Sequence, residues 1–218
     1  MNTKIIFIRH GQSEGNLKRV ILGHTDIGLT DLGLAQAESA AKRLKDEHID
    51  CIYSSDLKRA HNTALPHSLI HNLPITDSRE LREIFLGDWE GKSVDELLEK
   101  EYDGFVIGWK KNFGTYCPPG GESVPHLAQR IYDEVMRIVS LNLGKTILIT
   151  THAGAIRAFW GKISGILPED LAEKLPFPEN ASINTVIYDG EKLLPVKYSD
   201  DAHIVADSLR GESVSKVY

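Results

Sequence analysis

The sequence predicts an α/β protein, a three-layer α/β/α sandwich with a mostly parallel central sheet and a small helical cap. Short β-branched, apolar runs alternate along the 218-residue chain with segments whose apolar residues recur at helical spacing. Strands that alternate with helices are typical of parallel sheets covered on both faces. A chain of this length buries roughly 70% of its unfolded surface, so we expect residues 1–218 to form a single domain.

The first part of the chain is expected to contain two buried strands separated by a helix. The β-branched and aromatic run Lys4–Arg9 predicts the first strand. Thr30 is expected to cap a helix that runs to about Glu47, because a threonine hydroxyl accepts hydrogen bonds from the first turn. Cys51–Ser54 predicts the second strand.

The next segment contains one interrupted helix and one short helix. Asp56 is expected to cap the helix after the second strand. Pro66 should end or kink that helix near Ala64, because proline lacks the N–H that an interior turn requires. The residues from Ser93 to Glu96 form a capping-box pattern that predicts the start of a short helix.

The second half begins at the strongest chain break, Pro118–Gly121. Ser123 follows it and is expected to cap a long amphipathic helix. Lys145–Thr150 predicts a third buried strand, with a helix after it over about Ala153–Ser164. Asp189-Gly190 predicts a hairpin turn. The strands that this turn joins are expected at Ile183–Tyr188 and Leu193–Tyr198.

Residues 87–119 lie between core elements and are the candidate cap insertion. This segment is rich in aromatic residues, which we interpret as packing inside the cap, although an apolar wall facing substrate is an alternative. They are Trp89, Phe105, Trp109 and Phe113.

Composition excludes several classes of protein. With 25 Lys+Arg against 31 Asp+Glu, the chain carries a formal net charge of −6, which disfavours a nucleic-acid binder or an anionic-membrane binder. No apolar run approaches the roughly 18 residues of a membrane span. Cys51 and Cys117 have no zinc-ligand spacing, and the start of the chain does not read as a secretory signal. We therefore expect a cytoplasmic location.

Polar groups follow each of the three buried strands. These groups are Arg9-His10-Gly11, the segment from Ser54 to Arg59, and Thr151-His152-Ala153-Gly154. Ligands of such sheets bind beyond the carboxyl ends of the strands, so two histidines and two arginines should converge there. The planar fork of donors on arginine matches phosphate oxygens. The sequence therefore predicts a phosphate site.

A histidine beside two arginines is also a candidate nucleophile. Cationic neighbours favour neutral imidazole, and the arginines would offset charge on a transferring phosphoryl group. Release of an alcohol then needs a general acid, for which Glu80 and Glu83 are both available. Spacing alone does not choose between these two carboxylates.

Five ordered blocks resemble the histidine phosphatase superfamily, the phosphoglycerate-mutase-like family. They are Arg9-His10-Gly11 with Asn16, Gly23 and Leu29–Gly33, then Ser54–Ala60, then Leu81-Arg82-Glu83 with Gly87–Gly91, then Gly120–Ser123, and finally Thr151-His152. The resemblance extends from Lys4 to about Tyr188. It implies metal-independent chemistry without an organic cofactor.

The resemblance also implies roles for individual residues. His10 would become phosphohistidine, and Glu83 would protonate the leaving oxygen and later activate water. Arg9, Arg59 and His152 would line the phosphate pocket. Further substrate contacts are expected from Asn16, the backbone near Gly23, Ala153 and, from a tail segment, His203.

The favoured function is hydrolysis of a small-molecule phosphomonoester. Relatives that resemble glycolytic mutases carry a basic insertion, whereas residues 79–103 contain 4 basic and 9 acidic residues, a local charge of −5. The alternatives are a 2,3-bisphosphoglycerate-dependent phosphoglycerate mutase and a non-catalytic phospho-ligand binding module. The natural substrate and the oligomeric state stay open.

Three other side chains carry weaker signals. His67 and His71 are four residues apart and could face one metal ion, but no further ligand pattern accompanies them, so no metal site is expected. His24 follows Gly23 in the expected active-site loop and is interpreted as a loop histidine, with substrate contact as the alternative.

Overall fold

A computed structural model describes residues 2–206 and 208–210 of the chain. Within them a six-stranded sheet has the order β3-β2-β4-β1-β5-β6. The strands are β1 (Thr3–Arg9), β2 (Cys51–Ser55), β3 (Ile75–Ser78), β4 (Thr146–Thr151), β5 (Ile183–Tyr188) and β6 (Leu193–Asp200). The pairs β1–β4, β4–β2 and β2–β3 are parallel, and β5 and β6 extend the sheet in antiparallel pairing. The prediction of a mostly parallel sheet is therefore confirmed.

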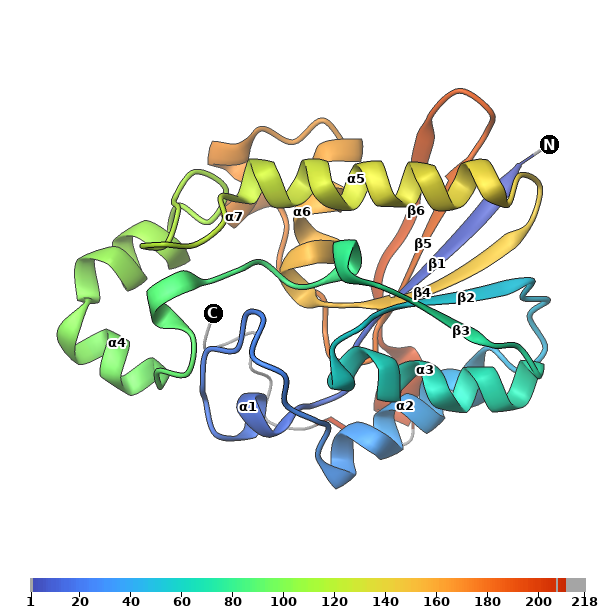
Figure 1. The fold of residues 1–218 in the computed structure, drawn as a ribbon, viewed down its shortest axis with the longest axis horizontal. Coiled ribbons are helices and arrows are strands. Elements are labelled where there is room, and N and C mark those ends of the chain that lie inside the picture. Colours follow the sequence, from blue (N-terminus) through green and yellow to red (C-terminus); the bar gives the residue numbers. More distant parts are fainter. Residues whose placement is uncertain (1, 207, 211–218) are drawn as a thin grey trace.

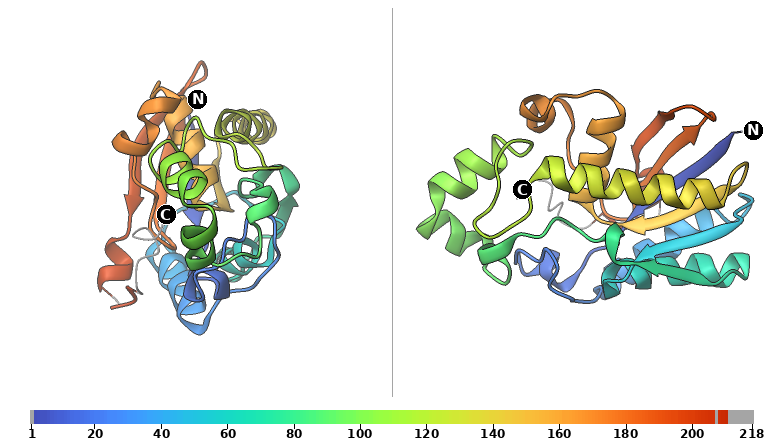
Figure 2. Two further views of the ribbon diagram at one scale, coloured as in Figure 1. Left: turned by 90° about the vertical axis from the view of Figure 1, so that its left-hand side faces the viewer. Right: turned by 45° about the horizontal axis from the view of Figure 1, so that its top comes forward.

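Helices cover both faces of this sheet. Figure 1 shows α5 and α6 on one side and α2 and α3 on the other, and Figure 2 shows the same layers from two further directions. The helices are α1 (Glu14–Leu17), α2 (Asp31–Arg43), α3 (Lys58–His71), α4 (Val94–Lys100), α5 (Val124–Leu141), α6 (Ala153–Ile163), α7 (Leu171–Lys174) and α8 (Ala202–Ala206). In the part of the chain that is described, no helix is both long and apolar enough to cross a membrane.

The two-residue period of β1 explains this layering. Ile5 and Phe7 belong to the large core beneath α5 and α6, whereas Ile6 and Ile8 belong to the smaller core on the opposite face. The ring of Phe7 packs at 5.1 Å from that of Phe159 on α6. A strand buried on both faces reads as a continuous apolar run, which is why the sequence revealed it.

Several predicted helix starts are confirmed. The hydroxyls of Thr30 and Ser123 accept hydrogen bonds from the N–H groups of Gly33 and His126, as N-caps do. Ser93 caps α4 through the Glu96 N–H, but the Glu96 carboxylate pairs with a lysine one turn along the helix. The α2 helix stops at Arg43 rather than near Glu47.

Two expectations for α3 are wrong. Leu57 is its N-cap residue, and the Asp56 carboxylate instead accepts two 2.6 Å hydrogen bonds from the Arg82 guanidinium. The helix also continues through Pro66 to His71, so the expected end near Ala64 is wrong, whereas a kink there, the other expected outcome, stays a prediction. One missing backbone hydrogen bond is outweighed here by a buried helix face that extends to His67.

Several short elements were not predicted, among them α1, α7, α8, one strand and one π-helix. Strand β3 (Ile75–Ser78) lies at the sheet edge and has one apolar residue, so it leaves no hydrophobic pattern. A π-helix over Asp103–Lys110 lies within the candidate cap. Single π-turns have no sequence signature of their own and are frequent at functional sites.

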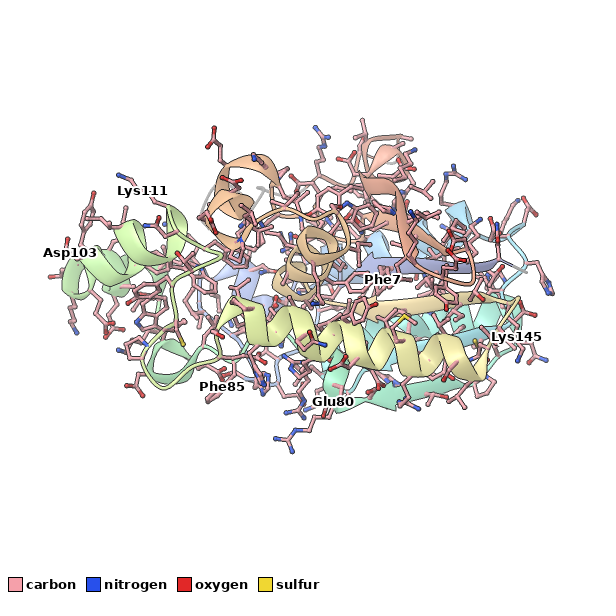
Figure 3. The ribbon with its side chains drawn as sticks, turned by 90° about the horizontal axis from the view of Figure 1, so that it is seen from above. Phe7, Glu80, Phe85, Asp103, Lys111 and Lys145 are labelled. Carbon is pink, nitrogen blue, oxygen red and sulfur yellow. The ribbon has the colours of Figure 1, made fainter. Side chains whose placement is uncertain are left out.

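The segment 87–119 leaves the sheet and returns to the same point. The Asp88 N–H donates to the Pro119 carbonyl at 3.0 Å, and the Glu122 N–H donates to the Phe85 carbonyl at 2.7 Å. Figure 3 shows Asp103 and Lys111, at the tip of this segment, at the opposite end of the molecule from Lys145. The segment therefore projects beyond the edge at which the parallel strands end.

His67 is an unusual core residue. Its side chain is fully buried on α3, and neither ring nitrogen has a hydrogen-bond partner among the described residues. Burial, followed by the nearby His71 and His203, lowers the pKa of His67 to about 3. In the described ranges no group of three or more His, Cys, Asp or Glu residues is placed to hold a metal ion.

We expect His67 to make the fold sensitive to acid. The unfolded chain takes up this proton below pH 6.5 and the folded chain only near pH 3, so stability falls as the pH drops through that window. Between pH 6.5 and pH 5 this one group accounts for about 1.5 kcal/mol. His67→Leu should remove that part of the pH dependence in urea unfolding. The same substitution at the exposed His48 is the control, and equal pH slopes for both variants would contradict the assignment.

Candidate active site

The register of the sheet brings the ends of three parallel strands level. Arg9 is paired with Thr151, and Ser54 is paired with Thr150. The His10 N–H then donates to the Thr151 carbonyl at 2.9 Å, which continues the ladder by one residue. As a result, the rings of His10 and His152 lie edge to face with centroids 5.2 Å apart.

The His10 ring is held in one tautomer. Its Nδ1 lies 2.7 Å from the Gly11 carbonyl oxygen. A carbonyl only accepts, so Nδ1 carries the hydrogen and the neutral ring keeps its lone pair on Nε2. Burial, then Arg59 and Arg9, hold the pKa of His10 well below its usual value. Neutral imidazole with a free Nε2 lone pair is the nucleophilic form.

Gly11 allows the backbone to pass close to α2. A Cβ atom at this position would lie 2.3 Å from the Gly33 carbonyl oxygen. Because backbone cannot yield as a flexible side chain can, only glycine fits in the turn after His10. Close packing against α2 thus explains why the third residue of the Arg9-His10-Gly11 block is glycine.

Backbone carbonyls orient the two arginines. Arg9 Nη1 donates to the Pro178 carbonyl at 2.5 Å. Arg59, near the start of α3, donates to the Thr25 carbonyl at 2.8 Å and to the Gly23 carbonyl at 2.7 Å. Both arginine residues are buried, with exposed fractions of 3% for Arg9 and 1% for Arg59. These carbonyls fix the direction of each fork without neutralising its charge.

His152 is fully buried at the N-cap of α6. Its Nε2 is 2.8 Å from the Ser55 hydroxyl at the end of β2, and its Nδ1 has no partner among the described residues. Burial, then Arg59 and His10, lower the pKa of His152 well below its usual value. A neutral ring therefore packs against His10.

The Glu83 carboxylate is anchored at the start of α6. Its Oε1 accepts from the Ala155 N–H at 3.0 Å and from the Ile84 N–H at 2.9 Å, and its Oε2 accepts from the Gly154 N–H at 3.1 Å. Oε2 thus accepts one of these hydrogen bonds and Oε1 accepts two. Glu80, by contrast, is exposed and lies at the periphery in Figure 3. The geometry selects Glu83 as the carboxyl group at the pocket.

Arg130 on α5 holds the segment that carries Glu83. Its guanidinium pairs with Glu122 at 2.8 Å. It also donates to the carbonyls of Glu80, Arg82 and Glu83 at 2.7, 3.1 and 3.2 Å. The ring of His24 reaches the same Glu83 carbonyl at 2.9 Å from the opposite loop. His24 is thus used in positioning, which the sequence did not reveal.

One pocket of about 590 Å³, partly open to solvent, collects most of these groups. Of the residues proposed from sequence, it is lined by Arg9, His10, Asn16, Gly23, Arg59, Glu83 and Ala153. Of those not proposed as site residues, it is lined by Leu22, Ile84, Leu86, Trp109, Gly154 and Phe177. The apolar members come from distant loops, and nothing in their spacing indicates a common surface.

His203 lies away from this pocket. It is buried on α8, where its Nε2 donates to the Ala181 carbonyl at 3.0 Å. Its own carbonyl is 3.4 Å from the Ser39 hydroxyl on α2. The structure therefore uses His203 to dock α8 and does not bring it to the other predicted site residues.

Comparison with known proteins gives the class of this fold and site. The family model described as the histidine phosphatase superfamily (branch 1) matches residues 5–201, so the chain belongs to that superfamily. It is 33% identical to a metal-independent phosphoserine phosphatase of Arabidopsis thaliana (93% of this chain, 83% of the relative). It is 35% identical to a 2,3-bisphosphoglycerate-dependent phosphoglycerate mutase of Cytophaga hutchinsonii (77% and 80%).

A solved structure agrees with this assignment. YhfR of Bacillus stearothermophilus superposes with a TM-score of 0.87 at 31% identity, covering 93% of this chain and 99% of that one. The resemblance seen in the sequence and the α/β/α fold class are both confirmed.

Arg59→Met should raise the pKa of His10, because it removes the positive charge with the larger effect on that ring while keeping most of the bulk of the side chain. NMR titration of the His10 ring measures this, with Arg79→Met, at an exposed arginine, as the control. A His10 pKa that stays unchanged or falls in Arg59→Met would show that the arginine does not set the charge state of the ring.

Proposed function

We propose that this protein is a metal-independent phosphomonoesterase that hydrolyses a small phosphorylated metabolite through a phosphohistidine on His10, with Glu83 as general acid and base. The observation that carries the proposal is the fixed His10 tautomer, which leaves the Nε2 lone pair available in a pocket with two buried guanidinium groups. The name of the Arabidopsis relative supports metal independence.

In the first step, His10 Nε2 forms a bond to phosphorus while the bond to the alcohol oxygen breaks. Glu83 gives its proton to that oxygen, and the neutral alcohol leaves. Arg9, Arg59 and His152 surround the phosphoryl group, whose growing charge the guanidinium forks offset. In the second step water attacks phosphorus, Glu83 takes a proton from it, and the bond to His10 Nε2 breaks.

The remaining contacts have smaller roles. Asn16, the backbone at Gly23 and the N–H of Ala153 at the start of α6 are proposed to contact phosphate oxygens, and all three line the pocket. The position of His203 on α8 gives no support to a direct contact. We propose residues 1–218 as a single domain with 87–119 as its cap. The free thiols of Cys51 and Cys117 support a cytoplasmic location.

A phosphoglycerate mutase is the second candidate, and the similarity to the Cytophaga mutase favours it. A mutase must bind a substrate with two strongly anionic groups and keep water from the phosphohistidine. The described cations that line the pocket are Arg9 and Arg59, and residues 79–103 before and within the cap carry a charge of −5. These charges favour hydrolysis of a monophosphate.

His10→Ala should abolish both hydrolysis of p-nitrophenyl phosphate and acid-labile phosphate labelling of the protein, because the nucleophile is lost. His61→Ala, at a partly exposed histidine outside the pocket, is the control. The wild-type protein should also release phosphate from 3-phosphoglycerate faster than it forms 2-phosphoglycerate. Retained hydrolysis in His10→Ala would refute the phosphohistidine, and faster isomerisation would assign the protein as a mutase.

Gly154→Ala should slow phosphorylation of His10 by an alkyl phosphate by about 10²-fold, because the added Cβ would lie 2.5 Å from Glu83 Oε1 and displace the general acid. Phosphorylation by p-nitrophenyl phosphate, whose leaving group needs no proton, should fall much less. Single-turnover kinetics measure both rates. Gly28→Ala is the control, since its Cβ meets nothing within 4 Å. Equal losses with both substrates would argue against Glu83 as the acid.

A further inference from the structure

The pocket has two chemically different halves. Arg9, His10 and Arg59 form the phosphate side. The remaining wall is apolar and is built from separate segments of the chain. Its members are Leu22 after α1, Ile84 and Leu86 after Glu83, Trp109 from the cap and Phe177 after α7. An alcohol group attached to phosphate in this pocket would lie against that wall.

The aromatic part of the wall is preformed. Trp109 packs edge to face on Phe113 with ring centroids 4.8 Å apart, and Phe113 packs in the same way on Phe177 at 5.0 Å. Trp89, in the cap interior, packs edge to face on Trp109, with ring centroids 6.1 Å apart and an interplanar angle of 88°. Such edge-to-face pairs hold each ring in place beyond simple burial. The wall therefore offers a fixed surface for dispersion contacts.

Arg157 on α6 supports this wall from behind. Its guanidinium lies 4.1 Å from the Phe177 centroid and 4.4 Å from the Phe113 centroid. It also donates to the carbonyls of Leu175, Leu171 and Ala172. Its exposed fraction is 4%, and it does not line the pocket. This cation is therefore engaged with rings and carbonyls instead of being offered to a substrate.

Among the described residues, no cation lines the wall side of the pocket. The described charged residues that line the pocket are Arg9, Arg59 and Glu83, and both cations are on the phosphate side. Glu83 adjoins the wall through its neighbour Ile84. A carboxylate or second phosphate on the alcohol would face apolar groups and this carboxyl group, and it would lose its hydration without gaining a partner.

We propose that the natural substrate is a monophosphate ester of an apolar alcohol that carries no second anionic group, and that Trp109 is the main residue that selects it. This inference rests on the proposed phosphomonoesterase function. The proposed substrate therefore differs from phosphoserine and phosphoglycerate, the compounds that appear in the names of two relatives.

The test compares alkyl esters with similar leaving oxygens. These are 3-phenylpropyl phosphate, glycerol 3-phosphate, O-phosphoserine and 3-phosphoglycerate. For the wild-type protein we expect kcat/KM for the phenylpropyl ester to exceed that for either anionic ester by at least about tenfold, as burial of one aromatic ring provides. A preference for O-phosphoserine or 3-phosphoglycerate would overturn the inference and leave the hydrolase function intact. Failure to hydrolyse any ester, p-nitrophenyl phosphate included, would instead overturn the proposed function.

Two variants test the wall itself. Trp109→Ala should lower the ratio of kcat/KM for phenylpropyl phosphate to that for glycerol 3-phosphate by at least about fivefold. Ile107→Ala, in the same π-helix but 46% exposed and outside the pocket, should keep the ratio. Leu86→Lys adds a cation to the wall and should shift preference toward 3-phosphoglycerate, a gain that a folding defect cannot produce. An unchanged preference in Leu86→Lys, or equal ratios in Trp109→Ala and Ile107→Ala, would overturn the role of the wall.

Discussion

The burial of two guanidinium groups beside two imidazoles is the constraint on which the site depends. Removing a charge from water is costly unless polar groups surround it, and here the carbonyls near Pro178, Thr25 and Gly23 do so without cancelling the charge. Burial, followed by the positive charge of Arg59, lowers the pKa of both His10 and His152, so both rings are neutral. One arrangement therefore creates both an anion-binding field and an unprotonated ring nitrogen.

The carboxyl group at the pocket is positioned by different parts of the fold. The first N–H groups of α6 bind the Glu83 side chain, while Arg130 on α5 binds the backbone of the same segment. The Thr151 hydroxyl at the end of β4 adds a 2.6 Å hydrogen bond to the Leu81 carbonyl. The Glu122 that pairs with Arg130 belongs to the Gly-Gly-Glu-Ser block, so this motif acts on the site from outside the pocket.

Most of the sheet could be predicted from the sequence, because strands buried on both faces are continuous apolar runs. The phosphate side of the site could be predicted because the carboxyl ends of these parallel strands meet at one edge of the sheet. Residue spacing alone did not choose between Glu80 and Glu83, since that choice depends on which side chain reaches α6, and only the family resemblance favoured Glu83. For the apolar wall, the sequence offered only the cap aromatics, Trp109 among them, as an alternative, because Leu22 and Phe177 are far apart in the chain and line one pocket only in three dimensions. His203 was misplaced for the same reason: the packing of α8 on α2 decides where it lies.

The contact between the two ends of the 87–119 segment has a consequence for how such proteins can diverge. Because Asp88 is hydrogen-bonded to Pro119, the two ends of the segment lie side by side, and a connecting chain of another length can join them at the same place. Doubling the length of a flexible connection costs only about 0.6 kcal/mol in closure entropy. Insertions, deletions or exchange of the whole segment can thus reshape the surface presented to the alcohol, while the strand ends that hold His10 and Arg59 keep their register.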